Sequence, residues 1–276
     1  DPDVVLDRFR SDGYEGVDLG PLGYLGTGDA LDARLSRVGF GLAGGWIDLP
    51  FPDDDAFRAA LPAYRETLAV FRDVRRPADR PEPRPTLACS GRPERAARPG
   101  GGPEVRLDPA GWDRLIRNLA VAVAVARDEG LEPTFHHHAC TDVETVDEID
   151  ELLERSDVGL TFDTGHLILG GGDPVADLRR WVGRVNHVHL KDARADILHR
   201  VVAAGGGLRD VWESDAFVAL GEGDLDLAGV VTTLLDAGYD GWIVVEQDAL
   251  SGPRHGLDRM LEDQRANRAA LRRWFA

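Results

Sequence analysis

The feature that most constrains the fold of this chain is a regular alternation of strand-like and helix-like segments, which is clearest after residue 110. Short apolar runs typical of buried strands alternate with longer amphipathic segments typical of helices. Such an alternation predicts parallel strands, because each helix returns the chain to begin the next strand in the same direction. With 276 residues, the chain has the length of one (β/α)8 barrel, which uses roughly 250 residues.

We predict seven strands, at 17–19, 38–49, 86–89, 131–138, 157–163, 184–191 and 241–246. We predict helices at 2–12, 29–36, 54–73, 110–129, 145–155, 174–182, 226–237 and 255–274, with a loop at 90–104 that could be mobile. One helix has no strand before it. We therefore expect an α/β fold, a (β/α)8 TIM barrel, as one domain over residues 1–276, with its first strand upstream of Asp1. The rival is a doubly wound open sheet, but no G-x-G-x-x-G turn follows the predicted strand 17–19.

The charge of the chain argues against two classes of partner. The formal net charge is −17, which repels phosphate backbones and anionic lipid, so we expect no nucleic-acid and no membrane partner. The two cysteines, Cys89 and Cys140, lie far apart and lack metal-ligand spacing, which fits a reducing, cytoplasmic location. The sequence contains no apolar run of roughly 18 residues and no recognisable signal peptide.

Polar side chains gather where the predicted strands end. In a barrel the carboxyl ends of all strands meet at one face, and active sites are built there. The residues are Asp18, His136, His137, His138, Asp163, His187, His189, Lys191, Asp192 and Glu246, with His166 shortly after its strand. Their coincidence at the same end of successive strands predicts a functional site.

Individual residues leave alternatives open. His136 and His138 share one face of their strand and are expected to act as ligands or as acid–base groups. Asp163 follows an apolar strand and either binds a metal or caps the next helix, and Glu246 either binds a metal or pairs with an arginine. Lys191 is the only lysine among 32 basic residues. Codon bias explains the excess of arginine, and a lysine retained against that bias suggests a place where a guanidinium cannot substitute.

Imidazole and carboxylate ligands together suit one divalent ion, Mn²⁺ or Co²⁺ first, with Zn²⁺, Fe²⁺ or Mg²⁺ as alternatives. Such an ion polarises a carbonyl and stabilises an enediolate. The sequence therefore predicts a small polyhydroxylated ketone as the partner.

At these residues the chain resembles the xylose-isomerase-like TIM barrel superfamily of sugar isomerases, epimerases and dehydratases. The segments FHHHACTDVET, VGLTFDTGHL, VNHVHLKDAR and GWIVVEQD carry the resemblance, which is narrowest to the inosose (2-keto-myo-inositol) dehydratases. It implies metal ligands Asp163, His189 and Glu246. The fourth ligand of the family is usually a Glu at the end of the strand that here ends in His138, so we expect His138 there, with Glu144 as the alternative.

The resemblance implies elimination of water from a keto-inositol or related keto-sugar through a metal-stabilised enolate. Candidates for the base and the acid are His136, His166, Lys191 and Glu144, and those for substrate contacts are Asp18, His187 and Asp192. An isomerase or epimerase, or a lyase cleaving a 3-keto glycoside, would use the same site. Two further functions are alternatives. An endonuclease of the superfamily would need a basic groove, which the net charge of −17 argues against. A sugar-binding barrel without catalysis would bind its sugar whether or not a chelator is present.

Three positions depart from the pattern that the resemblance implies. Cys140 stands where Gly is expected, Asp18 where Glu is expected, and Leu220 where Pro is expected. Barrels of this type commonly form dimers or tetramers, so a homo-oligomer is compatible with the resemblance.

Overall fold

A computed structural model describes residues 1–250 and 256–275. Its centre is a six-stranded sheet in which every neighbouring pair is parallel. In spatial order the strands are β3 (Gly44–Leu49), β4 (Arg84–Cys89), β5 (Thr134–His136), β6 (Gly159–Asp163), β7 (Val185–Leu190) and β10 (Ile243–Val245). This order follows the chain, as a barrel requires.

The seventh predicted strand is present as β1 (Gly16–Val17), which lies outside the six-stranded sheet and pairs in parallel with β2 (Gly41–Leu42). The strand predicted at 38–49 is thus divided into β2 and β3. Ala43 joins them, and its amide still donates to the carbonyl of Val17, so the ladder is continuous across the break. The seven predicted strands are all present, although β5 covers only three residues of the predicted 131–138.

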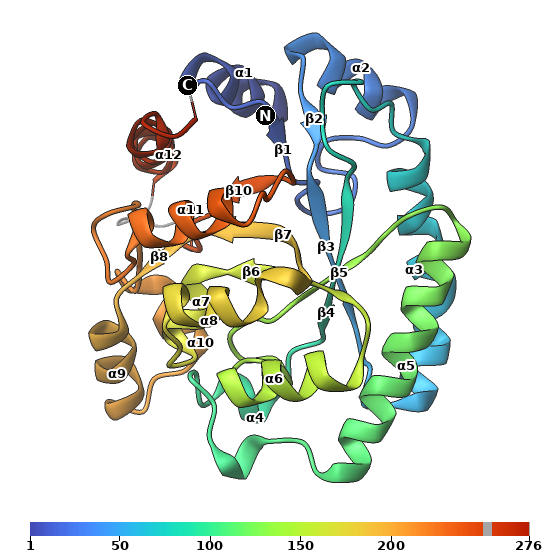
Figure 1. Ribbon diagram of the computed structural model, residues 1–276, viewed down its shortest axis with the longest axis vertical. Coiled ribbons are helices and arrows are strands. Elements are labelled where there is room, and N and C mark those ends of the chain that lie inside the picture. The colour runs from blue at the N-terminus through green and yellow to red at the C-terminus, as the bar shows by residue number, and fades with distance from the viewer. Residues whose placement is uncertain (251–255, 276) are drawn as a thin grey trace.

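Helices cover the outside of the curved sheet (Figure 1). The eight predicted helices are α1 (Pro2–Asp12), α2 (Asp29–Val38), α3 (Asp54–Asp73), α5 (Pro109–Asp128), α6 (Val146–Arg155), α8 (Pro174–Trp181), α11 (Leu227–Asp236) and α12 (Leu257–Leu271). Residue 255, predicted to begin the last helix, lies outside the described residues. The buried apolar side chains of sheet and helices form one continuous cluster. Among the described residues, no helix is both long enough and apolar enough to cross a membrane.

Several elements lie in segments that the sequence left unassigned or predicted as a loop. They are α4 (Pro93–Ala96), the 3-10 turn Pro103–Val105, α7 (Thr164–Leu169), α9 (Ala195–Ala203), α10 (Leu208–Glu213), and the antiparallel pair β8 (Asp192–Ala193) and β9 (Phe217–Val218). The prediction of a mobile loop at 90–104 is wrong in part, because Arg95 of α4 is fully buried and paired with Glu144 and Glu148. Those ion pairs tie the segment to the start of α6.

The strands β1 and β10 have no hydrogen-bonded neighbour on their outer sides within the described residues. A cavity of about 370 Å³ lies between them, bordered by residues 13–18 and 242–246 and by α12. The Trp242 ring lies across this gap and approaches Gly16, where a Cβ would be 2.6 Å from the indole.

Candidate metal centre

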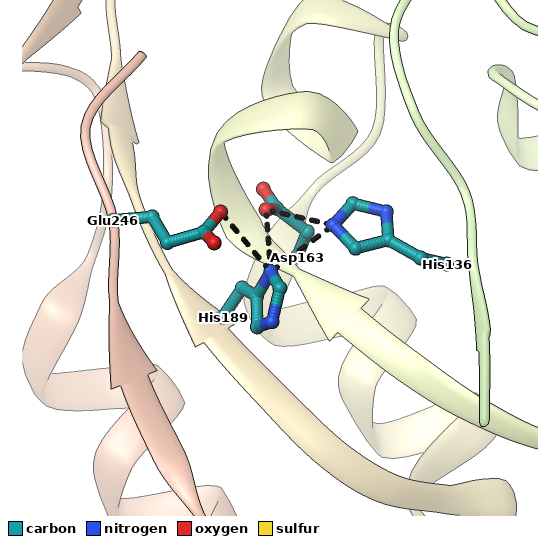
Figure 2. Close-up of side chains that lie close together, drawn as sticks. All are labelled: His136, Asp163, His189 and Glu246. Carbon is teal, nitrogen blue, oxygen red and sulfur yellow. Dashed lines mark hydrogen bonds and ion pairs between the residues drawn. The ribbon is translucent and has the colours of Figure 1, made fainter. Parts of the chain in front are cut away.

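Four side chains from four neighbouring strands converge at the carboxyl end of the sheet (Figure 2). They are His136, Asp163, His189 and Glu246, and one ligand atom of each lies within 4.8 Å of those of the others. His136 and Asp163 are the last residues of β5 and β6, His189 is the penultimate residue of β7, and Glu246 directly follows β10. The shared position in their strands is what brings them together.

The distances between these ligand atoms fit a cation. His189 Nδ1 lies 3.1 Å from both His136 Nε2 and Glu246 Oε2, and 3.6 Å from Asp163 Oδ2. Two adjacent ligands each about 2.0–2.2 Å from a common metal ion are about 2.8–3.6 Å apart in octahedral or tetrahedral arrangements. Asp163 Oδ2 is buried, accepts no hydrogen bond of good geometry in the described residues, and faces the ammonium of Lys191 at 3.2 Å. The four residues therefore fit a divalent cation.

The surrounding contacts orient the ligand atoms toward one another. His136 Nδ1 is 2.5 Å from the carbonyl oxygen of His137, so Nδ1 carries the proton and Nε2 is left with its lone pair. His189 Nε2 faces the carboxylate of Asp18 at 3.6 Å, which leaves Nδ1 for the cluster. Asp163 Oδ1 accepts the amide of His166 at the start of α7, so this carboxylate caps the helix and still offers Oδ2.

Lys191 brings the one ammonium group of the described site. Its Nζ is 3.2 Å from Asp163 Oδ2, 3.1 Å from Glu246 Oε2 and 3.2 Å from Asp248 Oδ1. Burial disfavours the charged amine, but these carboxylates outweigh burial and raise the pKa of Lys191 above its ordinary value. Lys191 is therefore an ammonium at neutral pH.

A second group lies on the other side of Lys191 and consists of His138, His166 and Asp248. The His138 and His166 rings are 3.7 Å apart between centroids, and His166 Nε2 is 3.2 Å from Asp248 Oδ2 and 2.9 Å from Lys191 Nζ. The same Nζ lies 3.1–3.2 Å from carboxylate oxygens of the four-residue cluster, so Lys191 connects the two groups.

The electrostatics of the main cluster favour positive charge among its carboxylates. Burial alone would raise the pKa of Asp163 and of Glu246, but neighbouring Lys191 and histidines hold both pKa values well below the usual range. Burial lowers the pKa of His136 to about 4, so this imidazole is neutral, as a metal ligand must be. Burial also disfavours charged His189, yet the carboxylates of Glu246, Asp163 and Asp18 raise its pKa well above the ordinary value. A cation at the cluster would satisfy the same carboxylates.

The structure places the contested fourth ligand differently from the expectation. His136, not His138, lies with Asp163, His189 and Glu246, because β5 ends at His136 and the chain turns after it. His138 faces the second group instead. The turn includes Cys140, the one non-glycine residue with a positive φ, 66°, in the described chain. A left-handed backbone explains why Gly is expected at this position in the family.

Glu144 is also placed outside the cluster. Its Oε1 accepts the amide of Gly100 at 2.7 Å, and its Oε2 lies 3.4 Å from Arg95. Both carboxylate oxygens therefore hold the segment around α4. This occupation argues against the ligand and acid–base roles expected for Glu144.

The three residues expected to contact the substrate mostly contact other parts of the protein instead. Both oxygens of Asp192 accept backbone amides, those of Ala193, Gly221, Gly223 and Leu225, so this carboxylate holds the turn after β9. His187 is fully buried two residues below His189 in the same strand, away from the strand ends. Asp18 faces His189. The structure thus argues against direct substrate contact for Asp192 and His187.

Three residues near the centre were missed by the sequence reasoning. Asp248 follows Glu246 by two residues, so the alternation of an extended chain could have placed both on one face. Trp46 and Asp48 of β3 alternate in the same way. Trp46 is 42% exposed and its ring centroid lies 5.5 Å from that of His136. Nothing in the composition of β3 marked it as part of a site.

Comparisons with known proteins agree with this fold. A family model described as "Xylose isomerase-like TIM barrel" matches residues 28–270. An inosose dehydratase of Geobacillus kaustophilus is 31% identical over 89% of this chain and 80% of its own length. The rhizopine catabolism protein MocC of Rhizobium meliloti is 34% identical over 91% of this chain and 76% of its own.

Among solved structures, the probable 3-DHS dehydratase AsbF of Bacillus anthracis superposes with a TM-score of 0.71 at 15% identity. That match covers 98% of this chain and 92% of AsbF and supports the fold. The strands are parallel and in sequential order, and the family model and two relatives match most of the chain. We conclude that the chain belongs to the xylose isomerase-like TIM barrel family.

Proposed function

We propose that this protein is a divalent-metal-dependent lyase that removes water from a keto-inositol, 2-keto-myo-inositol or a close relative, through an enolate. The observation that carries the proposal is the cluster of His136, Asp163, His189 and Glu246 with an ammonium and a second imidazole group directly beside it. The similarity to inosose dehydratases over most of the chain supports the substrate class.

In this proposal the four cluster residues hold one Mn²⁺ or Co²⁺ ion, and Asp18 orients His189 through its second ring nitrogen. A carboxylate behind a metal-binding histidine fixes the tautomer and the ring orientation. The bound cation supplies positive charge that polarises the ketone and stabilises the negative oxygen of the enolate. All other steps fall to side chains of this chain.

Elimination needs one group to accept the proton next to the ketone and another to protonate the departing hydroxyl. His136 faces the cluster and Glu144 is held by Arg95, which leaves His166 and Lys191 of the four expected candidates. His166 Nε2 lies 2.9 Å from Lys191 Nζ and 3.2 Å from Asp248 Oδ2, so this nitrogen faces the groups with which it can exchange a proton. We assign His166, with Asp248, to proton abstraction.

Lys191 is assigned to the departing hydroxyl. As an ammonium held by three carboxylates, it enters the reaction charged and can donate a proton while the C–O bond breaks. The hydroxyl leaves as water, and the electron pair of the broken C–H bond becomes the new double bond. The net change is the loss of one water molecule from the substrate.

Incubation of the metal-loaded protein with 2-keto-myo-inositol tests this proposal. Dehydration gives an unsaturated dione tautomer, so ultraviolet absorbance should rise with time and should stop when a chelator is added. Isomeric ketones without loss of water would instead support an isomerase or epimerase acting through the same enolate. Unchanged substrate in the presence of Mn²⁺ and Co²⁺ would refute both reactions.

A further inference from the structure

We infer that Trp46 and Asp48 form a platform that recognises the apolar face of a six-membered polyhydroxylated ring. This inference rests on the proposed function and names the part of the site that selects a cyclic over an open-chain polyol. The observation behind it is the exposure of the Trp46 side chain. Trp46 lies in the central sheet and contacts buried histidines, yet 42% of its surface is exposed.

The alternation of side chains along β3 places both residues inside the barrel. A Cβ on Gly44 would lie 3.1 Å from His187 Nε2, which belongs to the barrel interior. A Cβ on Gly45 would instead meet Phe71 of α3, in the outer helical layer. Successive side chains of a strand point to opposite faces. Trp46 and Asp48 therefore share the inner face with Gly44, and their exposure is toward the opening of the barrel.

The indole of Trp46 is held next to the candidate metal centre. Its ring centroid is 5.5 Å from that of His136 and 4.9 Å from that of His138, in both cases with steeply inclined ring planes. The indole Nε1 donates to Asp48 Oδ1 at 3.2 Å, and Ser90 donates to Asp48 Oδ2 at 2.9 Å. A ring whose ketone oxygen approaches the cluster would extend over this pair.

The chemistry of the pair suits a cyclic polyol. When the hydroxyls of a six-membered ring are equatorial, its faces present axial C–H groups, which are apolar and carry slight positive charge. An aromatic face carries the complementary negative charge. Asp48, which is exposed, has free lone pairs on both oxygens for hydroxyls at the ring edge. An open-chain polyol has no such flat apolar face and is discriminated against.

Calorimetric titration of the Mn²⁺-loaded protein with scyllo-inositol, a ring with six equatorial hydroxyls and no ketone, tests the platform without turnover. D-Sorbitol is the open-chain comparison with the same number of hydroxyls. We expect Trp46→Ala to weaken scyllo-inositol binding about tenfold, as expected for losing one aromatic contact. Trp46→Phe should stay within about threefold of the wild type, because it keeps an aromatic face. Trp274→Phe, next to the C-terminus and stacked on Arg273, is the matched control and should bind normally.

Metal content is measured for each variant, so that a collapsed centre is recognised. Unchanged scyllo-inositol binding by Trp46→Ala, no binding by the wild type, or equal affinity for sorbitol would overturn the platform. The reaction is judged separately. If binding depends on Trp46 but 2-keto-myo-inositol is not dehydrated, the proposed reaction fails and the platform stands. Dehydration with an unchanged KM in Trp46→Ala leaves the reaction standing and removes the platform.

Discussion

Lys191 Nζ lies 2.9 Å from His166 Nε2, at the boundary between the four-residue metal cluster and the group formed by His138, His166 and Asp248. An ammonium at this place belongs to both groups. It neutralises carboxylates of the cluster, and it touches the imidazole that we assign to proton transfer. The only lysine of the chain thus stands at the point where charge and proton transfer meet.

Two substitutions of Lys191 separate the effect of its charge on kcat from the effect of its shape. Lys191→Met removes the ammonium, and we expect kcat to fall by about 10²–10⁴, the usual contribution of an acid–base group. We expect the kcat of Lys191→Arg to fall by a similar factor, because a planar guanidinium cannot occupy a point 3.1–3.2 Å from three carboxylates in the same way. Steady-state kinetics and metal content would be measured for both. Wild-type kcat in Lys191→Arg would show that charge alone suffices.

Gly165 of α7 allows Lys191 to reach its position. A Cβ at residue 165 would lie 2.6 Å from Lys191 Cγ, so Gly165→Ala must displace the lysine stem or α7. We expect this variant to lose most of its kcat while retaining its metal ion. Gly183→Ala is the matched control, since an added Cβ there meets no described atom within 4 Å. Equal kcat in the two variants would contradict the placement of Lys191.

Asp192 should prove structural. Its two oxygens accept four backbone amides, and an asparagine there offers one acceptor oxygen and turns a donor toward the remaining amides. We expect Asp192→Asn to lower the free energy of unfolding by about 1–3 kcal/mol in urea denaturation. Asp224→Asn keeps an acceptor oxygen for the single exposed bond from the Ala195 amide and should cost about 1 kcal/mol or less. A stable Asp192→Asn variant with a raised KM would restore the substrate role.

The raised pKa of Glu144 predicts that the free energy of unfolding depends on pH in a specific way. Burial raises its pKa from the ordinary 4.5 to about 7, and Arg95, which lies closer to Glu148, does not offset this. Between these values the folded carboxyl stays protonated while the unfolded one ionises, so the wild type loses stability as pH rises. The loss is on the order of 2–3 kcal/mol between pH 4.5 and 8.

Glu144→Gln removes this titration. The unfolding free energy of the variant relative to the wild type should therefore increase from pH 5 to pH 8, as measured by urea denaturation at each pH. Exposed Glu154, near the end of α6, provides the control, and Glu154→Gln should show a flat difference. A difference for Glu144→Gln that falls with pH would mean that the carboxylate is stabilised by Arg95 when ionised.

Much of the architecture was predictable because it rests on periodicity. The helices over 54–73 and 174–182 and the apolar strands before Asp163 and Glu246 follow from patterns that a helix or a buried strand imposes. The convergence of strand-end residues follows from parallel topology alone. These features need no knowledge of long-range contacts.

The remaining features depend on contacts between distant residues. The choice of His136 over His138 depends on where β5 ends, and a run of three histidines does not reveal that point. Arg95 looked like part of a polar loop because its partners Glu144 and Glu148 lie about fifty residues further on. Trp46 was missed since its exposure depends on which distant residues surround its ring in the folded chain, which no local pattern encodes.

The central claim is that one divalent cation is held by His136, Asp163, His189 and Glu246. Metal analysis of purified variants, by mass spectrometry of the digested protein, tests it most directly. The account predicts one ion per wild-type chain, loss of the ion in Glu246→Gln, Asp163→Asn and His136→Ala, and retention in His138→Ala. Full metal content in Glu246→Gln, or loss in His138→Ala with retention in His136→Ala, would contradict it.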